Sequence, residues 1–136
     1  MTAFSLLLQD ATRAEHVDGV SSFVGEDASG SFGILPGHAR FMTTLVVGLA
    51  RYRCGEQPWQ YLALPGAVLY FNGDRLTLST RRYLRDADYL RISAALAQQL
   101  LAEEENLRTV KDSLHQMEEE LLRRLWEMNR TGDASP

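Results

Sequence analysis

The chain has 136 residues, 45% of them hydrophobic and 24% charged, which is typical of a soluble globular protein. Its net charge of −4 disfavours non-specific binding to nucleic acid. No apolar run approaches the ~20 residues of a membrane helix, the N-terminus lacks a secretory-signal pattern, and the single cysteine, Cys54, favours a reducing compartment.

Residues 1–85 have the pattern of a β domain. Their apolar residues alternate with polar ones, as at Leu76 and Leu78, which places apolar side chains on a core face. Short runs of this kind, separated by turns, favour a sandwich or a barrel. The clearest turn signals are Gly55–Pro58, Pro65-Gly66 and Asn72-Gly73-Asp74, the last of which predicts a hairpin.

The run Gly30–Ala39 contains three glycines, Pro36 and His38. Glycine allows positive φ and proline fixes φ, so the run predicts rigid turns rather than a flexible linker. His38 has two interpretations at this point: a contact with a partner, or a side chain that only caps backbone groups of its own turn.

Residues 86–136 have a helical pattern. No glycine or proline interrupts residues 87–129, and apolar residues recur at intervals of three and four. This stripe comprises Leu96, Leu100, Leu107, Val110, Leu114, Met117, Leu121 and Met128, with Arg124 at a position where an apolar residue would fit.

A single helix over residues 87–129 would be about 64 Å long and would expose that stripe. The helix must therefore fold back, pack on the β domain or bury the stripe against a partner. We expect a bend at the acidic segment Glu103–Asn106, which gives a helical hairpin, with an extended arm as the alternative. Residues 1–85 carry eight Arg and seven Asp or Glu, whereas residues 86–136 carry six Lys or Arg and eleven Asp or Glu. This asymmetry indicates two domains, 1–85 and 86–136.

The residues predict neither catalysis nor a metal site. The three histidines are scattered, no glycine-rich loop precedes the only lysine, Lys111, and no nucleophile-elbow motif occurs. Cys54 follows Arg51 and Arg53, which could lower its pKa, but a small core side chain is the plainer interpretation.

Four segments in the same order resemble the epsilon subunit of F-type rotary ATP synthases. They are the strands Phe4–Leu8 and Val17–Val24, the turn Gly30–Ala39, the paired strands Gly66–Leu69 and Gly73–Leu78 joined by a turn, and the helical last third. The resemblance implies an α+β fold: a ten-stranded β-sandwich followed by a two-helix hairpin. It also implies a non-catalytic rotor subunit of the central stalk, at the cytoplasmic face of a bacterial inner membrane.

The resemblance implies partners as well. The gamma subunit would hold one side of the sandwich, and Ser31 and His38 map onto the family turn that contacts the membrane c-ring. Many relatives carry an acidic residue where this chain has Ser31, and proline is common where it has Arg40.

The helical tail would regulate hydrolysis by reaching the alpha and beta subunits of the catalytic head. Arg123, Arg124 and Arg130 are suited to that contact. The alternative is a solvated face, because Arg124 follows Glu120 and Arg123 follows Glu119 at the i,i+4 spacing of helical ion pairs.

Asp88 and Arg91 keep two positions of the motif with which some relatives bind regulatory ATP, but Ala87 and Ile92 depart from it. An exposed Asp and Arg at this spacing are also common on helices. No other cofactor is expected. The competing interpretation of the whole chain is a non-enzymatic adaptor, in which a β-sandwich presents a coiled-coil-forming tail to another assembly.

Overall fold

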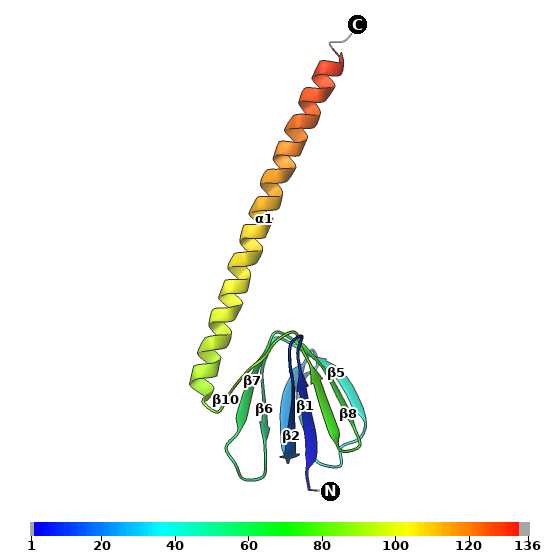
Figure 1. Ribbon diagram of the computed structural model, residues 1–136, viewed down its shortest axis with the longest axis vertical. Coiled ribbons are helices and arrows are strands. Elements are labelled where there is room, and N and C mark those ends of the chain that lie inside the picture. The colour runs from blue at the N-terminus through cyan, green and yellow to red at the C-terminus, as the bar shows by residue number, and fades with distance from the viewer. Residues whose placement is uncertain (1, 134–136) are drawn as a thin grey trace. The chain divides into compact units, whose positions relative to one another are not determined.

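The computed structural model describes residues 2–133, with side chains described up to Asn129. Ten strands are followed by one helix, α1 (Tyr89–Asp133), which confirms the expected α+β order (Figure 1). The strands are β1 (Phe4–Gln9), β2 (Ala14–Val20), β3 (Ser22–Asp27), β4 (Gly30–Ile34), β5 (Phe41–Leu45), β6 (Gly48–Arg53), β7 (Gln60–Leu64), β8 (Ala67–Asn72), β9 (Arg75–Ser79) and β10 (Leu84–Asp86). Over the described residues, α1 has no stretch apolar enough to cross a membrane.

The chain divides into two compact units, residues up to 97 and residues from 98 onward. The first turns of α1 therefore belong to the same unit as the strands. We call residues 98–133 of the helix the arm.

The strands form one sheet in the order β10-β7-β6-β3-β5-β8-β9-β1-β2, with β4 added beside β3. Strands β3 and β5 share a single residue pair, Asp27 with Leu45, so the sheet turns a corner there. The corner divides the sandwich into a first layer, from β10 to β3 with β4, and a second layer, from β5 to β2.

The core lies between the two layers because the inward residues of the strands are apolar. Phe23 of the first layer and Phe71 of the second are fully buried, and the ring of Phe4 packs edge-on against Phe71 at 5.4 Å between centroids. Burying each such side chain contributes about 1.5–3 kcal/mol. The predicted Asn72–Asp74 hairpin is confirmed: Asn72 pairs with Arg75 across a turn in which Gly73 has φ +66°.

The corner is fixed by the carboxylate of Asp27. It accepts hydrogen bonds from the hydroxyl of Thr43 at 2.8 Å and from the backbone N–H of Ser29 at 2.9 Å. The hydroxyl of Ser29, followed by that of Thr43, lowers the pKa of Asp27 below its ordinary value. The ionised carboxylate thus ties the β3–β4 turn to β5.

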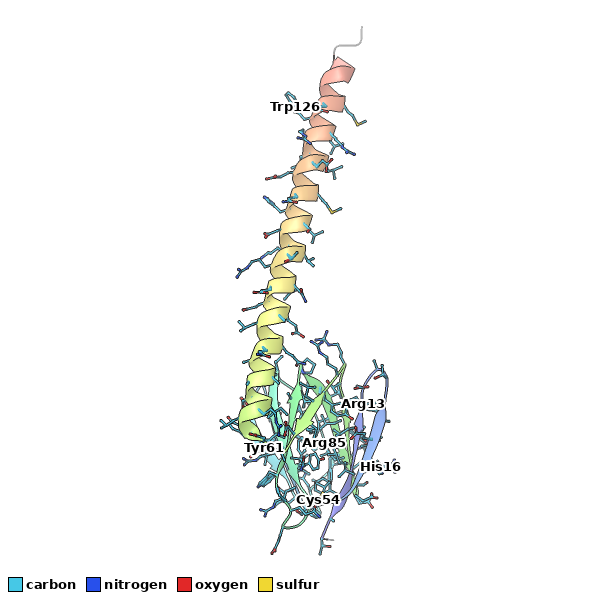
Figure 2. The ribbon with its side chains drawn as sticks, turned by 60° about the vertical axis from the view of Figure 1, so that its left-hand side comes forward. Arg13, His16, Cys54, Tyr61, Arg85 and Trp126 are labelled. Atoms are coloured by element: carbon cyan, nitrogen blue, oxygen red, sulfur yellow. The ribbon has the colours of Figure 1, made fainter. Side chains whose placement is uncertain are left out.

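The two end strands of the sheet, β2 and β10, are joined by side chains. Arg85 donates to Glu15 at 2.8 Å, and both side chains are about one-third exposed (35% and 29%). Arg13 donates to the carbonyl of Tyr83 at 3.2 Å and lies 4.3 Å from the centroid of the Tyr83 ring. Figure 2 labels both arginines. We call this cluster the seam, because it closes the sandwich where the described strands have no backbone pairing.

The helix α1 is continuous, so the bend predicted at Glu103–Asn106 is wrong and the extended alternative holds. No glycine or proline occurs between residues 87 and 129, and most residues there are good helix formers. The i→i−4 hydrogen bonds therefore continue through the acidic segment, and α1 is a single helix. The helix begins at a capping residue: the Asp88 carboxylate accepts from the backbone N–H groups of Leu90 at 3.0 Å and Arg91 at 3.3 Å.

The apolar stripe of the arm is exposed along its length. Leu107, Leu114 and Met117 are 69%, 59% and 66% exposed. Leu125 lies four residues after Leu121 and so continues the stripe past Arg124 on a straight helix. Leu122 and Trp126, which the sequence analysis did not include, widen it further.

Candidate functional site

The β3–β4 hairpin carries Ser31, the first of the two residues predicted to contact the membrane c-ring. Gly30 occupies the turn with φ +126°, a conformation that other residues rarely adopt. Ser31 pairs with Glu26 across the hairpin and is exposed, while Phe32 and Ile34 turn toward the core. The hydroxyl of Ser31 therefore lies on the outer surface of the first layer.

His38, the second predicted residue, lies in the turn between β4 and β5. Its backbone N–H donates to Leu35, and its ring Nδ1 donates to the carbonyl of Ala39 at 2.7 Å. The ring packs edge-on against Phe41 and Phe71, at 5.6 and 5.9 Å between centroids. His38 thus caps its own turn, as one of its two interpretations requires, yet the residue is exposed to solvent.

The structure does not bring Ser31 and His38 together at one point. Ser31 lies at the beginning of β4, and His38 follows the end of that strand. Among the described strands, β4 pairs with β3 alone. A partner that contacts both residues must therefore lie along the outer edge of β4, where backbone donors and acceptors are available.

The exposed Arg75 lies on the outer surface of the second layer, next to the β8–β9 turn. The middle of that surface lacks charged side chains, a feature that the sequence analysis missed. It consists of two register-matched rows: Met42, Tyr70, Thr77, Leu7 and His16, and Thr44, Val68, Ser79, Gln9 and Ala14. Met42 is 67% exposed and Val68 43% exposed. We call this surface the uncharged face. It could not be read from single strands, because the rows join residues far apart in the sequence.

The outer surface of the first layer has a hollow of about 410 Å³ that is lined by charged as well as apolar residues. The residues lining it are Val24, Glu26, Ser31, Leu49, Ala50, Arg51, Tyr61 and Tyr89. The Arg51 guanidinium lies 4.7 Å from the centroid of the Trp59 ring. Opposite charges and an apolar floor fit an amphipathic partner better than a purely apolar one.

The predicted nucleotide residues lie at the start of α1 and already have structural roles. Asp88 caps the helix, and the Nε of Arg91 contacts the carboxylate of Asp86 at 2.7 Å. A backbone hydrogen bond from Asp88 lowers the pKa of Asp86, so its carboxylate is ionised beside Arg91. The ring of Tyr61, which Figure 2 labels, lies 5.4 Å from that of Tyr89 between centroids, and Ile92 is only 2% exposed. These contacts fix the first turns of α1 on the strands.

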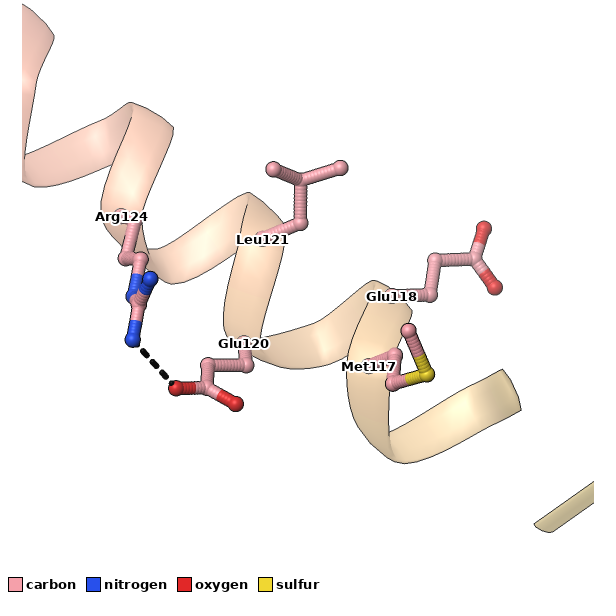
Figure 3. Close-up of a pocket in the computed structure, with 5 residues that line it drawn as sticks. All are labelled: Met117, Glu118, Glu120, Leu121 and Arg124. Carbon is pink, nitrogen blue, oxygen red and sulfur yellow. Dashed lines mark hydrogen bonds and ion pairs between the residues drawn. The ribbon is translucent and has the colours of Figure 1, made fainter. Parts of the chain in front are cut away.

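The predicted arginines of the arm lie on its exposed surface. Arg124 donates to Glu120 at 2.8 Å, next to Leu121 and Met117 of the apolar stripe, as Figure 3 shows. This confirms one of the two expected ion pairs. Glu119 instead contacts His115 at 3.2 Å, and Arg123 is exposed. The side chain of Arg130 lies outside the described residues.

Over the described residues, no group of His, Cys, Asp and Glu side chains has the arrangement of a metal site. Cys54 packs against the core, and burial raises the pKa of its thiol. The arginines beside it in the sequence therefore do not activate it. The described surfaces have features suited to contacts with other proteins.

Comparison with known proteins agrees with this picture. Residues 5–86 match the family described as "ATP synthase, Delta/Epsilon chain, beta-sandwich domain". ATP synthase epsilon chain 2 of Cereibacter sphaeroides is 38% identical over 95 residues, which are 69% of this chain and 65% of the relative. The ATP synthase epsilon chain of Geotalea uraniireducens is 37% identical over 86 residues, 61% and 59% of the two chains.

Two solved structures share the fold. One is a chain of the Euglena gracilis mitochondrial ATP synthase, OSCP/F1/c-ring, with a TM-score of 0.59 at 16% identity, covering 72% of this chain and 64% of the other. The other belongs to the Tetrahymena thermophila mitochondrial ATP synthase, central stalk/c-ring, with a TM-score of 0.52 at 12% identity, covering 59% and 64%. The chain spans less than two thirds of the length of the curated relatives described above. The match over residues 5–86 nevertheless covers more than half of this chain, which therefore belongs to the delta/epsilon chain family of ATP synthases, defined by their β-sandwich domain.

Proposed function

We propose that the chain is a non-catalytic rotor subunit of an F-type ATP synthase, held by the gamma subunit and placed between it and the membrane c-ring. The observation that carries the proposal is the uncharged face, on a sandwich that matches this family. A peripheral position at the cytoplasmic side of a bacterial inner membrane follows from this role.

The uncharged face is our choice for the gamma contact. Desolvating charged side chains is costly, so a stable interface places them at its rim, and this face has none in its two rows. Met42 and Tyr70, at the β5 end of the first row, supply the exposed thioether and the half-buried aromatic ring that such interfaces favour. Arg40, 5.7 Å from the centroid of the Tyr70 ring, lies at the edge.

Substitution by lysine tests this contact. Met42→Lys and Val68→Lys place a charge in the interface and should abolish co-purification with gamma, while the sandwich keeps its melting temperature. Val47→Lys is the matched control, because Val47 is 47% exposed and lies outside the two rows. If Met42→Lys still co-purifies with gamma, the gamma contact lies on another surface of the chain.

We place the ring contact along the outer edge of β4, from Ser31 to His38. The polar loops of the c-ring would pair with this edge, and the imidazole of His38 would be a further contact. The double variant Ser31→Ala, His38→Ala should weaken coupling between ATP hydrolysis and ion pumping in reconstituted membranes. The isolated sandwich should remain folded, because both side chains are exposed. Unchanged coupling would remove this assignment.

We propose that the arm restrains hydrolysis by contacting the catalytic head through its apolar stripe, with Arg123, Arg124 and Arg130 meeting acidic segments there. Deletion of residues 98–136 tests this role and leaves Ile92 in place on the strands. The ATPase rate of the assembled complex should rise. An unaltered rate would show that the arm does not inhibit.

Regulatory ATP binding at Asp88 and Arg91 stays a prediction. It requires the Arg91 guanidinium to exchange Asp86 for a phosphate group. Calorimetry of the full chain with ATP, and with Arg91→Ala as control, measures it. Heat of binding that disappears in the variant would support the site, and the absence of heat with the unaltered chain would exclude it.

A further inference from the structure

The seam contains a buried hydroxyl group that lacks a hydrogen-bond partner. Tyr83 is only 3% exposed, and its hydroxyl forms no hydrogen bond with any of the described residues. The Glu15 carboxylate is close enough to raise the pKa of Tyr83, after the larger effect of burial, but the two groups do not meet in hydrogen-bond geometry. A buried donor without a partner costs free energy that is recovered when water reaches it. The seam therefore includes one unfavourable element.

Tyr52, on β6, is the opposite case. It is also 3% exposed, but its hydroxyl accepts a hydrogen bond from the Arg85 guanidinium at 3.3 Å. Arg85 in turn contacts Glu15 at 2.8 Å. Of these two buried tyrosine hydroxyls, the one on Tyr52 thus stabilises the position of β10, whereas the one on Tyr83 opposes it.

The segment that the seam holds has few buried contacts. We call residues 83–97, which comprise β10 and the first turns of α1, the root segment. Within it only Tyr83 and Ile92 are buried, and β10 pairs with β7 through three residues. The two parts of the segment are linked, because Arg91 contacts the carboxylate of Asp86 at 2.7 Å. A linked segment with few buried contacts opens as a unit and at a lower free-energy cost than the core.

Strand β2 connects the seam to the uncharged face. Successive side chains of a strand point to opposite sides. Ala14 and His16 belong to the two rows of the uncharged face, and Glu15 between them contacts Arg85, which Figure 2 labels. Among the described strands β2 pairs with β1 alone, and Val20 is its only buried residue. A partner that orders β2 from the uncharged face therefore also fixes Glu15 beside Arg85.

We propose that the root segment opens and closes on the strands as one unit, and that gamma, bound to the uncharged face, holds it closed through β2 and Glu15. The structure described here is the closed form. In the open form water hydrates the Tyr83 hydroxyl, while Ile92 loses its burial on the strands. The opening depends on contacts of this chain alone, whereas its control by gamma rests on the proposed function.

Opposing contributions determine the balance between the closed and open forms. Burial of the Tyr83 ring and of Ile92 favours the closed form, and the unpaired hydroxyl favours the open form. A partner that binds one form more tightly shifts such a balance by its difference in affinity. Because coupling between two sites is reciprocal, opening of the root segment must also weaken gamma binding. Glu15 should therefore affect the affinity for gamma although it lies outside the two rows.

Two matched substitutions test the opening by hydrogen exchange of the full chain, read by mass spectrometry. Tyr83→Phe removes the unpaired hydroxyl and should slow amide exchange of the root segment by about tenfold. Tyr52→Phe makes the same change in an equally buried residue but removes a hydrogen bond of Arg85, and should make that exchange severalfold faster. Exchange in Tyr83→Phe that is unchanged or faster would overturn the proposal. So would a response of β10 that the first turns of α1 do not share.

The same measurement on the complex with purified gamma tests the coupling. Bound gamma should slow exchange of the root segment in the parent chain. Glu15→Gln should bind gamma roughly fivefold more weakly and lose this protection, whereas Glu56→Gln, the same change at an exposed residue outside the seam, should behave as the parent. A parent chain that binds gamma without slower exchange of the root segment would refute the coupling and leave the gamma contact in place. Failure of the parent to bind gamma would refute the proposed function and the coupling together.

Discussion

The seam between β2 and β10 gives the most specific prediction about the stability of the sandwich. Glu15 lies 2.8 Å from Arg85 and 3.6 Å from Arg13, so one carboxylate is shared by two arginines. Arg85 also donates to the hydroxyl of Tyr52 at 3.3 Å. Removing the carboxylate and removing one arginine should therefore have different consequences.

Glu15→Gln leaves Arg13 and Arg85 close together with no carboxylate between them, and should cost about 2 kcal/mol of unfolding free energy. Arg85→Met keeps Arg13 beside Glu15 and should cost about 1 kcal/mol. Both values lie between those of exposed and buried ion pairs, as suits side chains that are 29% and 35% exposed. The double variant should be more stable than the sum of the single effects predicts, by about 1 kcal/mol.

Urea unfolding of the full chain, followed by tryptophan fluorescence and far-UV circular dichroism, measures these differences. Arg81→Met is the control, because Arg81 is an exposed arginine near β10 that has no role in the seam. If the single effects were equal and strictly additive, the shared carboxylate would not hold the two end strands together.

Three further predictions follow from the contacts of the sandwich and of α1. The carboxylate of Asp27 has a lowered pKa in the folded chain, so its contribution to the free energy of unfolding is present above the unfolded pKa of about 4 and is lost as the pH falls through the folded pKa. Measurements of the free energy of unfolding against pH should show this loss in the parent chain and not in Asp27→Asn. Asp88→Ala removes the cap of α1 and should lower the free energy of unfolding by about 1 kcal/mol. Amide exchange at Leu90 and Arg91 should become faster, and unchanged exchange would show that Asp88 does not stabilise the start of the helix. Ile92→Ser should release the first turns of α1 from the strands and lower the melting temperature, whereas Leu101→Ser, on the exposed arm, should not.

The sequence predicted the local structure of the sandwich well because local signals determine it. Alternation at Leu76 and Leu78 places their side chains inward, and Gly73 supplies the positive φ that the β8–β9 turn requires. The pairing of distant strands was beyond such signals. The parallel pairing of β1 with β9, the corner at Asp27 and the seam at Arg85 each join residues whose proximity depends on the whole fold.

The same distinction explains the outcome at the candidate sites. Ser31 and His38 were identified by a family turn, but the length of β4 that separates them appears only in the structure. The uncharged face depends on the register between β5, β8, β9, β1 and β2. At Glu103–Asn106 the acidic charges predict a bend, but helix propensity prevails and α1 continues without a break.

Co-purification with the gamma subunit tests the central claim most directly. The chain, expressed together with gamma and c-ring subunits, should be recovered in a stable one-to-one complex with gamma, and Met42→Lys should abolish that complex while Val47→Lys preserves it. Recovery of the folded chain without gamma would contradict the proposed place of this protein in the rotor.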